Sequence, residues 1–391
     1  MDLTGRPGGP GLGAPPALLH LVAQAADVLA RRSDGRVVVD GLALLGERAA
    51  LGNLTRQGAI SCGGSTRLVR TADGWLAVSL ARPDDIDALG AWLCEDVSPD
   101  DPWPTVERIA AASDAVSLDA RAALLGLPIA ALSSVGPPEA PAFDLPIGAA
   151  CVHQTTEVPR ALAGALVVDL SALWAGPLCG QLLAAAGANV VKVESLARPD
   201  GARRGPAAFF DLMNGLKRSV ALDLTTSSGR CDLHRLISAA DVVIESARPR
   251  GLEQMGVVAA DVLGQPVGPR VWASITSHGR GPGRGERVGF GDVAAVAGGL
   301  VAYDEDGPCF LADAVADPLA GLVAAAGVLE ALATRGRWLL SVAMAPLAAA
   351  VVGPALDVSG ARAHPPRARP IDRPAAPLGS DTAAVLRHVP A

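Results

Sequence analysis

The chain has few aromatic residues and almost no lysine. Phenylalanine, tryptophan and tyrosine make up 3% of its 391 residues, so its core must consist mainly of alanine, valine and leucine. Lys192 and Lys217 are the only lysines, and every other Lys/Arg position is arginine, a bias typical of a GC-rich genome. The net charge of −7 disfavours broad binding to nucleic acids or anionic membranes, so we expect neither as a partner.

Motifs for metals, disulfides and secretion are also missing. The six cysteines are scattered without a CxxC pair, and the six histidines show no HxxxH or HExxH spacing. We therefore expect no metal, and buried free thiols in a reducing cytoplasm. The N-terminus lacks the apolar segment of a signal peptide, and the most apolar stretch, 338–353, is too short to span a bilayer. These observations predict a cytoplasmic protein.

Residues 1–155 predict a small α+β region. Asp73-Gly74 between two alternating apolar runs is a hairpin signal. Helical periodicity and short apolar runs predict helices over 17–32, 84–94 and 104–126, a strand-like run and a helix within 36–50, and a strand at 128–135. The proline cluster at 137–146 follows. The length of the chain makes a second domain the natural expectation.

Residues 163–350 have a different pattern, in which short apolar strands alternate with helices. Strands are predicted at 165–170, 189–194, 219–224, 241–245 and 270–276, and helices at 178–186, 227–239 and 250–256. This alternation predicts an α/β fold, a Rossmann-like open parallel sheet with flanking helices, and ligands at the carboxyl ends of its strands. There is no GxGxxG after the first strand and no P-loop, so a dinucleotide lacks its usual support. Residues 351–391 are expected to form a tail that packs back on this domain.

Asp317 stands at the start of a strongly predicted helix, with Pro318 in its first turn. A carboxylate there lies in the positive end of the helix dipole and can accept free backbone N–H groups. Two interpretations follow from the residues. Asp317 is either an ordinary helix cap or a nucleophile.

An ordered series of segments resembles the class III CoA-transferases, the group that includes formyl-CoA and carnitine CoA-transferases and the α-methylacyl-CoA racemases. The series comprises 168–179, 187–194, the N-x-x-K-R-S segment at 214–224, 240–249 with Met255-Gly256, and the Asp317 helix. Residues 61–135, with Thr71-Ala-Asp-Gly-Trp75, are similar to the family's small domain, and 377–386 resemble its C-terminal ending. That small domain normally follows the aspartate helix, so the chain resembles a rearranged or truncated tandem version.

The resemblance implies a CoA-transferase that moves CoA from an acyl-CoA to an acceptor carboxylic acid. Asp317 would be the nucleophile, passing through aspartyl–acyl anhydride and aspartyl–CoA intermediates. CoA and acyl-CoA are substrates, no cofactor is bound permanently, and the protein forms an interlocked homodimer. By position, CoA contacts are expected from Leu173, Trp174, Arg198, Leu222, Ser246, Ala247, Gln254 and Met255. Arg198, Arg203, Arg204 and Arg248 are either phosphate ligands or solvated surface arginines.

The segment before the aspartate helix departs from the family. Gly289-Phe-Gly-Asp lacks the common tyrosine–acid pair, and Phe290-Gly291 occupy the place of the racemases' His-Asp pair. Racemisation needs a base on each side of the α-carbon, so this argues against it. His278 is either a base or, as we favour, a plain loop histidine, and Gly63-Gly64 are either a lid or a turn. The alternatives to transfer are an inactive acyl-CoA-binding homologue or partner subunit and, after it, racemisation or dehydration.

Overall fold

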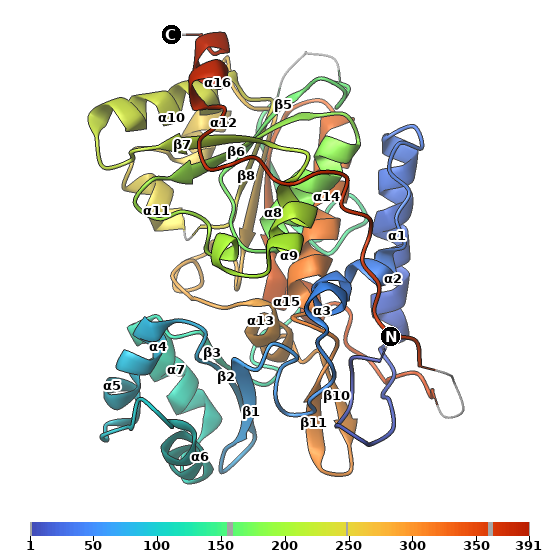
Figure 1. The fold of residues 1–391 in the computed structure, drawn as a ribbon, viewed down its shortest axis with the longest axis vertical. Helices are drawn as coiled ribbons and strands as arrows, with labels where there is room; N and C mark the ends of the chain where they lie inside the picture. Colours follow the sequence, from blue (N-terminus) through green and yellow to red (C-terminus); the bar gives the residue numbers. More distant parts are fainter. Residues whose placement is uncertain (1, 155–158, 248, 359–362, 391) are drawn as a thin grey trace.

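The computed structural model describes residues 2–154, 159–247, 249–358 and 363–390. It contains a large sheet between two layers of helices and a smaller part built on a three-stranded sheet (Figure 1). The predicted α/β class with a smaller α+β unit is confirmed.

The large sheet has seven strands in the order β4-β12-β9-β8-β5-β6-β7. All neighbours are parallel except β4, which runs antiparallel to β12 at one edge. The chain moves outward from β5 to β7, then returns to the other side of β5, so the strand order reverses between β5 and β8. The strands are β4 (Gly148–His153), β5 (Leu166–Asp169), β6 (Asn189–Ser195), β7 (Arg218–Leu222), β8 (Val242–Glu245), β9 (Val271–Thr276) and β12 (Arg337–Ala343).

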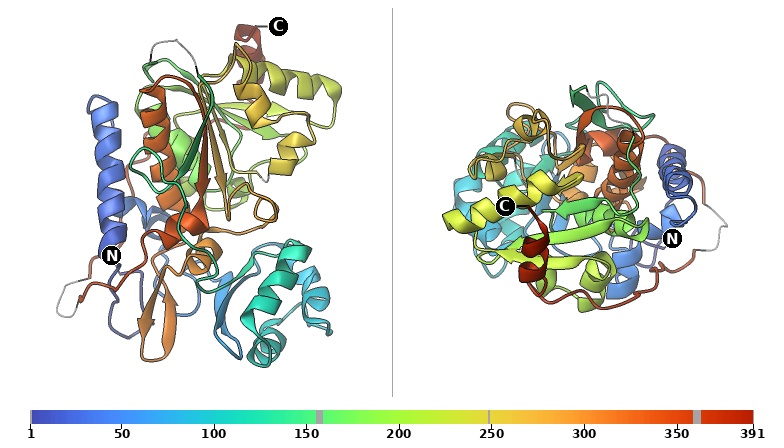
Figure 2. Two further views of the ribbon diagram at one scale, coloured as in Figure 1. Left: turned by 180° about the vertical axis from the view of Figure 1, so that it is seen from behind. Right: turned by 90° about the horizontal axis from the view of Figure 1, so that it is seen from above.

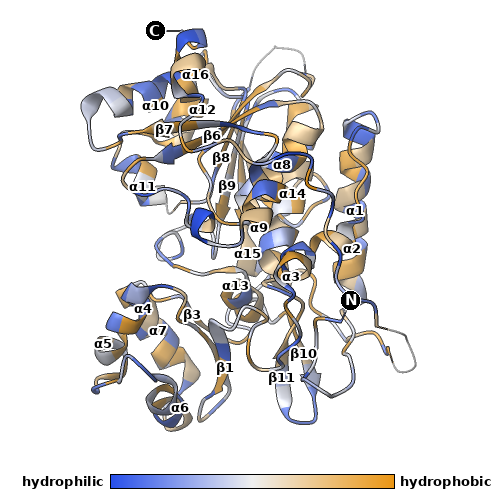
Figure 3. Cartoon of the chain, in the orientation of Figure 1, coloured by the Kyte–Doolittle hydropathy of each residue, from blue (hydrophilic) through white to orange (hydrophobic). Residues whose placement is uncertain are grey.

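Helices cover both faces of this sheet and enclose two separate cores. One face carries α1 (Pro16–Arg32), α8 (Ala175–Ala185), α9 (Ala207–Asn214) and α14 (Ala316–Leu332). The other carries α10 (Ser227–Ala239), α11 (Pro249–Glu253), α12 (Ala259–Leu263) and α16 (Thr382–His388). Helix α14 packs against α8, α1 and the sheet at once (Figure 2). Such a helix is apolar on all sides, as the hydropathy colours of Figure 3 show.

The smaller part is an antiparallel sheet of β1 (Thr66–Arg70), β2 (Trp75–Ser79) and β3 (Ile129–Ala131) with its own core. The predicted hairpin at Asp73-Gly74 is confirmed, since Arg70 pairs with Trp75 across it. Each long predicted helix is instead two shorter ones: α4 (Pro83–Asp87) and α5 (Leu89–Leu93), then α6 (Trp103–Ala111) and α7 (Ala115–Leu125). The second pair is divided because Asp114 accepts the N–H of Ser117 and starts α7 anew.

The remaining elements complete the large part or lie between the two parts. They are α2 (Gly41–Leu44), α3 (Glu47–Gly52), η1 (Gly201–Arg204), α13 (Gly291–Ala297), the hairpin β10 (Val301–Asp304) and β11 (Gly307–Phe310), and α15 (Met344–Ala349). Helix α13 contacts β2 and β3 on one side and α14 and α15 on the other. The strand expected near 36–40 is wrong, because Asp40 caps α2 by accepting the N–H groups of Leu42 and Ala43.

The large part draws on both ends of the chain. Helix α1 packs on α14, and β4 is an edge strand of the large sheet, although both lie before residue 155. The large and small parts therefore do not separate at residue 155, where the sequence predicted the boundary. The tail crosses the large part, where Arg369 pairs with Glu47 and Asp381 accepts the N–H of Ser219.

Two further sequence expectations concern the thiols and the membrane. All six cysteines are unpaired, and Cys179 and Cys309 are buried. Cys94 and Cys231 are exposed, so the expectation that the thiols are buried is wrong for these two. Within the described ranges, no helix combines the length and the apolar character needed to cross a bilayer.

Candidate active site

Asp317 is the second residue of α14, and its carboxylate contacts a different helix. Val315 is the N-cap of α14, and no side chain caps this helix. Asp317 Oδ2 instead accepts the N–H of Gly291, the first residue of α13, at 3.0 Å. The interpretation of Asp317 as the cap of its own helix is therefore wrong.

The starts of α13 and α14 hold each other. Asp292, the second residue of α13, accepts the N–H of Ala314 at 3.1 Å, just before α14 begins. A Cβ at Gly291 would lie 2.5 Å from Asp317 Oδ2, so glycine is needed for this close approach. The positive ends of two helix dipoles thus meet at the Asp317 carboxylate.

Three carboxylates surround one guanidinium at this junction. Arg48, from α3, holds the fully buried Asp313 with both Nε, at 2.9 Å, and Nη2. The charge of Arg48 also acts on Asp292 and Asp317. The guanidinium lies 5.1 Å from the ring centroid of Trp174, on which it stacks. One cation is therefore shared by three acidic side chains.

Burial shifts the titration of two of these carboxyls. The pKa of Asp317 is raised to about 6 by burial, while Arg48 and the Gly291 N–H oppose the shift and Asp313 adds to it. Burial also raises the pKa of Asp292 to about 7, against the charge of Arg48 and with that of Asp313 and Asp317. The Asp317 carboxylate is thus mainly ionised at neutral pH.

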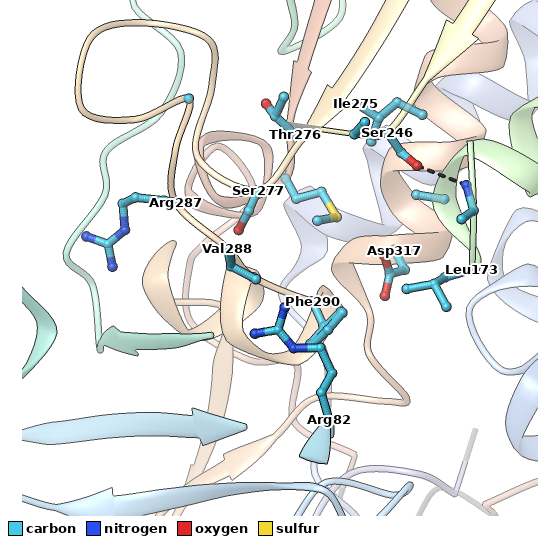
Figure 4. A pocket seen from close by; sticks show the side chains of 16 residues that line it. Arg82, Leu173, Ser246, Ile275, Thr276, Ser277, Arg287, Val288, Phe290 and Asp317 are labelled. Carbon is cyan, nitrogen blue, oxygen red and sulfur yellow. Dashed lines mark hydrogen bonds between the residues drawn. The ribbon is translucent and has the colours of Figure 1, made fainter. Parts of the chain in front are cut away.

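Asp317 opens into a cavity of about 230 Å³ at the carboxyl ends of β5, β8 and β9 (Figure 4). The reversal of strand order lies between two of these strands, so the cavity is where an open α/β sheet binds ligands. Ala172, Leu173, Ser246 and Ala247 line one side. The segment 285–290 and Arg82, from the start of α4, line the other.

The geometry can be set beside known proteins. A family model described as CoA-transferase family III matches residues 162–361, about half of the chain. The chain belongs to this family. It is 33% identical over 190 residues to succinyl-CoA–D-citramalate CoA-transferase of Chloroflexus aurantiacus, covering 46% of this chain and 47% of that protein. It is 34% identical over 187 residues to formyl-CoA:oxalate CoA-transferase of Rhodopseudomonas palustris, covering 45% and 43%.

A further relative is a probable fatty acyl-CoA transferase of Mycobacterium tuberculosis, 34% identical over 198 residues, with 47% of this chain and 49% of that protein covered. The chain thus spans about half the length of the curated relatives it matches.

Four of the residues predicted from the family III resemblance meet at the cavity: Asp317, Leu173, Ser246 and Ala247. Ser246 Oγ accepts the N–H of Ala172 at 3.0 Å and so joins the turns that follow β8 and β5. Leu173 has a φ of +69°, and its N–H is held by Asp200 at 3.0 Å. This strained turn leaves the Leu173 side chain 42% exposed.

The other predicted contacts lie elsewhere. Trp174 is buried beneath Arg48 and packs edge-on against Phe209, and Leu222 is buried in the core on the opposite face of the sheet. Arg198 and Gln254 are exposed, and Met255 is half-buried. None of these five lines the Asp317 cavity as described.

The other arginines considered as phosphate ligands, where the structure describes them, also do not line the cavity. Arg203 pairs with Glu194 and lies over Phe210, Arg204 is exposed, and Arg248 lies outside the described residues.

The two lysines support the turn that carries Leu173. Lys217 Nζ binds Asp169 at 2.7 Å, the Pro177 carbonyl at 2.8 Å and Asn214 at 3.0 Å. Lys192 Nζ binds Asp200 at 2.8 Å and the Ser171 carbonyl at 2.9 Å. A compact ammonium with three donors suits such crowded sites better than a planar guanidinium does. Both lysines are therefore structural parts of the site.

Sequence reasoning missed Arg48, Asp292 and Arg82. Arg48 lies 265 residues from its partner Asp313, a separation at which no local pattern could connect them. Gly291-Asp292 at a helix start is a signal that could have been noticed, since acidic residues favour first turns.

Two further alternatives from the sequence concern Gly63-Gly64, as a lid or a turn, and His278, as a base or a loop histidine. Gly63 lies in a turn, and a Cβ there would lie 3.4 Å from Arg48 Nη2. His278 lies in the loop after β9 but is buried, and burial with Arg287 and Arg284 lowers its pKa to about 3. His278 is therefore neutral at physiological pH. It is also not among the residues that line the cavity.

Proposed function

We propose that this chain transfers CoA from an acyl-CoA thioester to an acceptor carboxylic acid, with Asp317 as the nucleophile. The observation that carries the proposal is the position of the Asp317 carboxylate in the cavity. Oδ2 is held by the Gly291 N–H, and Oδ1 has no protein partner within the described ranges. A carboxylate fixed through one oxygen leaves the other free to attack a thioester.

The transfer proceeds in four displacements at acyl carbon. An Asp317 oxygen attacks the thioester carbonyl, the C–S bond breaks, and CoA leaves as thiolate. The thiolate attacks the aspartyl carbonyl of the anhydride and releases the donor acid as a carboxylate. The acceptor carboxylate then attacks the aspartyl–CoA thioester and expels the thiolate again. Attack of the thiolate on the acceptor carbonyl gives the new acyl-CoA and restores Asp317.

The relatives reported above are all named as CoA or acyl-CoA transferases, which supports transfer as the reaction class. Racemisation receives no support from the cavity, because Phe290 and Gly291 provide no base and the His278 ring lies outside it. The interlocked homodimer implied by the family remains a prediction, which light scattering of the purified chain measures.

Trapping with hydroxylamine tests the proposal. Incubation with an acyl-CoA and hydroxylamine should place a hydroxamate on Asp317, detected by peptide mass spectrometry. Asp317→Asn should give none, whereas Asp261→Asn, at an exposed position on α12, should label as the parent protein does. Binding of acyl-CoA without any adduct would instead favour the inactive binding homologue.

A further inference from the structure

The Asp317 cavity has a second end that the CoA expectation does not use. In Figure 4, Leu173 and Ser246 lie on one side of Asp317, whereas Ser277, Val288 and Arg82 lie on the other. If CoA approaches along the turns after β5 and β8, the acyl group of the thioester faces this second end. Its side chains therefore decide which acyl groups fit.

Ser277 presents an unused hydroxyl there. The residue is 7% exposed, lines the cavity, and its Oγ has no hydrogen-bond partner among the described residues. Any Cβ at residue 289 would clash with Ser277 Oγ, so Gly289 is what leaves room for it. A buried hydroxyl without a partner is costly, and a ligand atom that bonds to it removes the cost.

Arg82 adds a fixed cationic group to the same end. Its Nε donates to Asp85 Oδ1 at 2.9 Å, Nη2 donates to Asp85 and to the Gly126 carbonyl, and the guanidinium lies 5.8 Å from the Phe290 ring centroid. These contacts hold the group in place and leave Nη1 without a protein partner in the described part of the chain. Nη1 can therefore donate to an oxygen in the cavity.

Apolar side chains also line this end, namely Ile275, Val288, Phe290 and Met344. Thr276 and Arg287 line the cavity too, and the Arg287 guanidinium is already paired with Asp119. The volume of about 230 Å³ is below the roughly 300 to 1,000 Å³ of sites that enclose drug-sized ligands. This volume favours a short acyl group over a long alkyl chain.

We propose that Ser277 and Arg82 select short acyl groups that carry an oxygen substituent, a carboxylate above all, and bind that substituent beside Asp317. The inference rests on the proposed function and names the substrate class of the same site. A hydroxyl and a guanidinium N–H together match a carboxylate, whereas an isosteric alkyl end would leave the Ser277 hydroxyl and Arg82 Nη1 without a partner.

Two matched thioesters test the selection. Succinyl-CoA and 4-methylpentanoyl-CoA differ in ending with a carboxylate or with an isopropyl group of similar shape. The parent protein should form the Asp317 hydroxamate from succinyl-CoA with a kcat/KM at least roughly tenfold higher. Ser277→Ala and Arg82→Gln should each reduce this ratio roughly tenfold, mainly through KM for succinyl-CoA. Ser117→Ala, at an exposed position on α7, should leave the ratio unchanged.

Direct binding separates this inference from the proposed function. Calorimetry of the two thioesters with Asp317→Asn measures the preference when no transfer occurs. A succinyl preference that Ser277→Ala removes supports the selection, even if no hydroxamate forms on the parent protein. Equal affinities for the two thioesters, or an equal loss for both in Ser277→Ala, would overturn it.

Discussion

The two walls of the Asp317 cavity are built in different ways. The wall over the large sheet consists of turns that directly follow β5 and β8, and it offers backbone groups and small side chains such as Ala172 and Ser246. The opposite wall brings a charged side chain, Arg82, from the smaller part, and Arg48 reaches the same junction from α3. The sheet thus forms one side of the cavity, and the N-terminal residues set the charge around Asp317.

Two ion pairs near the cavity, Lys217–Asp169 and Arg48–Asp313, also differ in how deeply their cations are buried. The Lys217–Asp169 pair supports the sheet wall and is almost fully buried, with side-chain exposures of 1% and 0%. Arg48 keeps 32% of its side chain exposed while it holds the buried Asp313. Removal of the lysine should therefore act mainly on folding, whereas removal of the arginine should also act on titration of the site.

The largest expected effect is on turnover, when Asp317, the proposed nucleophile, is changed. Asp317→Asn keeps the size of the side chain and its contact with the Gly291 N–H but cannot form the anhydride. We expect kcat to fall roughly 10⁴-fold or more, measured by steady-state CoA transfer. Asp261→Asn is the control. Retained turnover in Asp317→Asn would contradict the assignment.

Lys217→Met should reveal the role of the sheet wall. It leaves the Asp169 carboxylate buried without its cation, which should lower the free energy of unfolding by roughly 3–5 kcal/mol. Urea denaturation measures the change. The exposed Arg31→Met, which breaks a surface pair with Asp27, is the control and should cost at most about 1 kcal/mol. A similar loss in both variants would erase the difference between buried and surface charges.

Arg48→Met should reveal, through pH, how Arg48 acts on the charge of Asp317. The rate of Asp317 labelling should rise with pH through a midpoint at about 6, because the carboxylate is the reactive form. Arg48 lowers the pKa of Asp317, so its removal should move this midpoint to higher pH. The measurement is labelling rate against pH in both proteins. An unchanged midpoint would show that Arg48 only supports Asp313.

Asp292→Asn should change how the stability of the protein depends on pH. The folded-state pKa of Asp292 is about 7, above its unfolded value of about 3.9. The native state therefore holds a proton that the unfolded state has released, and stability falls as pH rises from about 4 to about 7. Asparagine keeps the contact with the Ala314 N–H and removes this loss.

The Tm of Asp292→Asn relative to the parent protein should accordingly be higher at pH 8 than at pH 5, by calorimetry. Asp261→Asn should show no such trend. A difference that stays constant with pH would mean that Asp292 is ionised at no cost in the native state.

Sequence patterns predicted the strands that form the sheet side of the cavity, but they missed Arg82 and Arg48. The strands from β5 to β9 are short apolar runs between helices, so these strands and the position of Asp317 at a helix start could be predicted from neighbouring residues. Arg82 reaches the opposite wall, and Arg48 the junction behind Asp317, by contacts between distant parts of the chain, such as Arg48 with Asp313, which no periodicity encodes. The predicted contacts at Trp174 and Leu222 lie away from the cavity because their side chains are packed in cores.

The burial of both lysines has a chemical consequence if the chain acts on thioesters as proposed. Acyl-CoA slowly acylates exposed amines without any catalyst, and the usual targets are surface lysine side chains. Lys192 and Lys217 are 2% and 1% exposed and already engaged as cations, and the chain has no other lysine. If the chain acts as proposed, a surface on which every exposed Lys/Arg side chain is arginine, which does not compete for the acyl group, would protect it from modification by acyl-CoA.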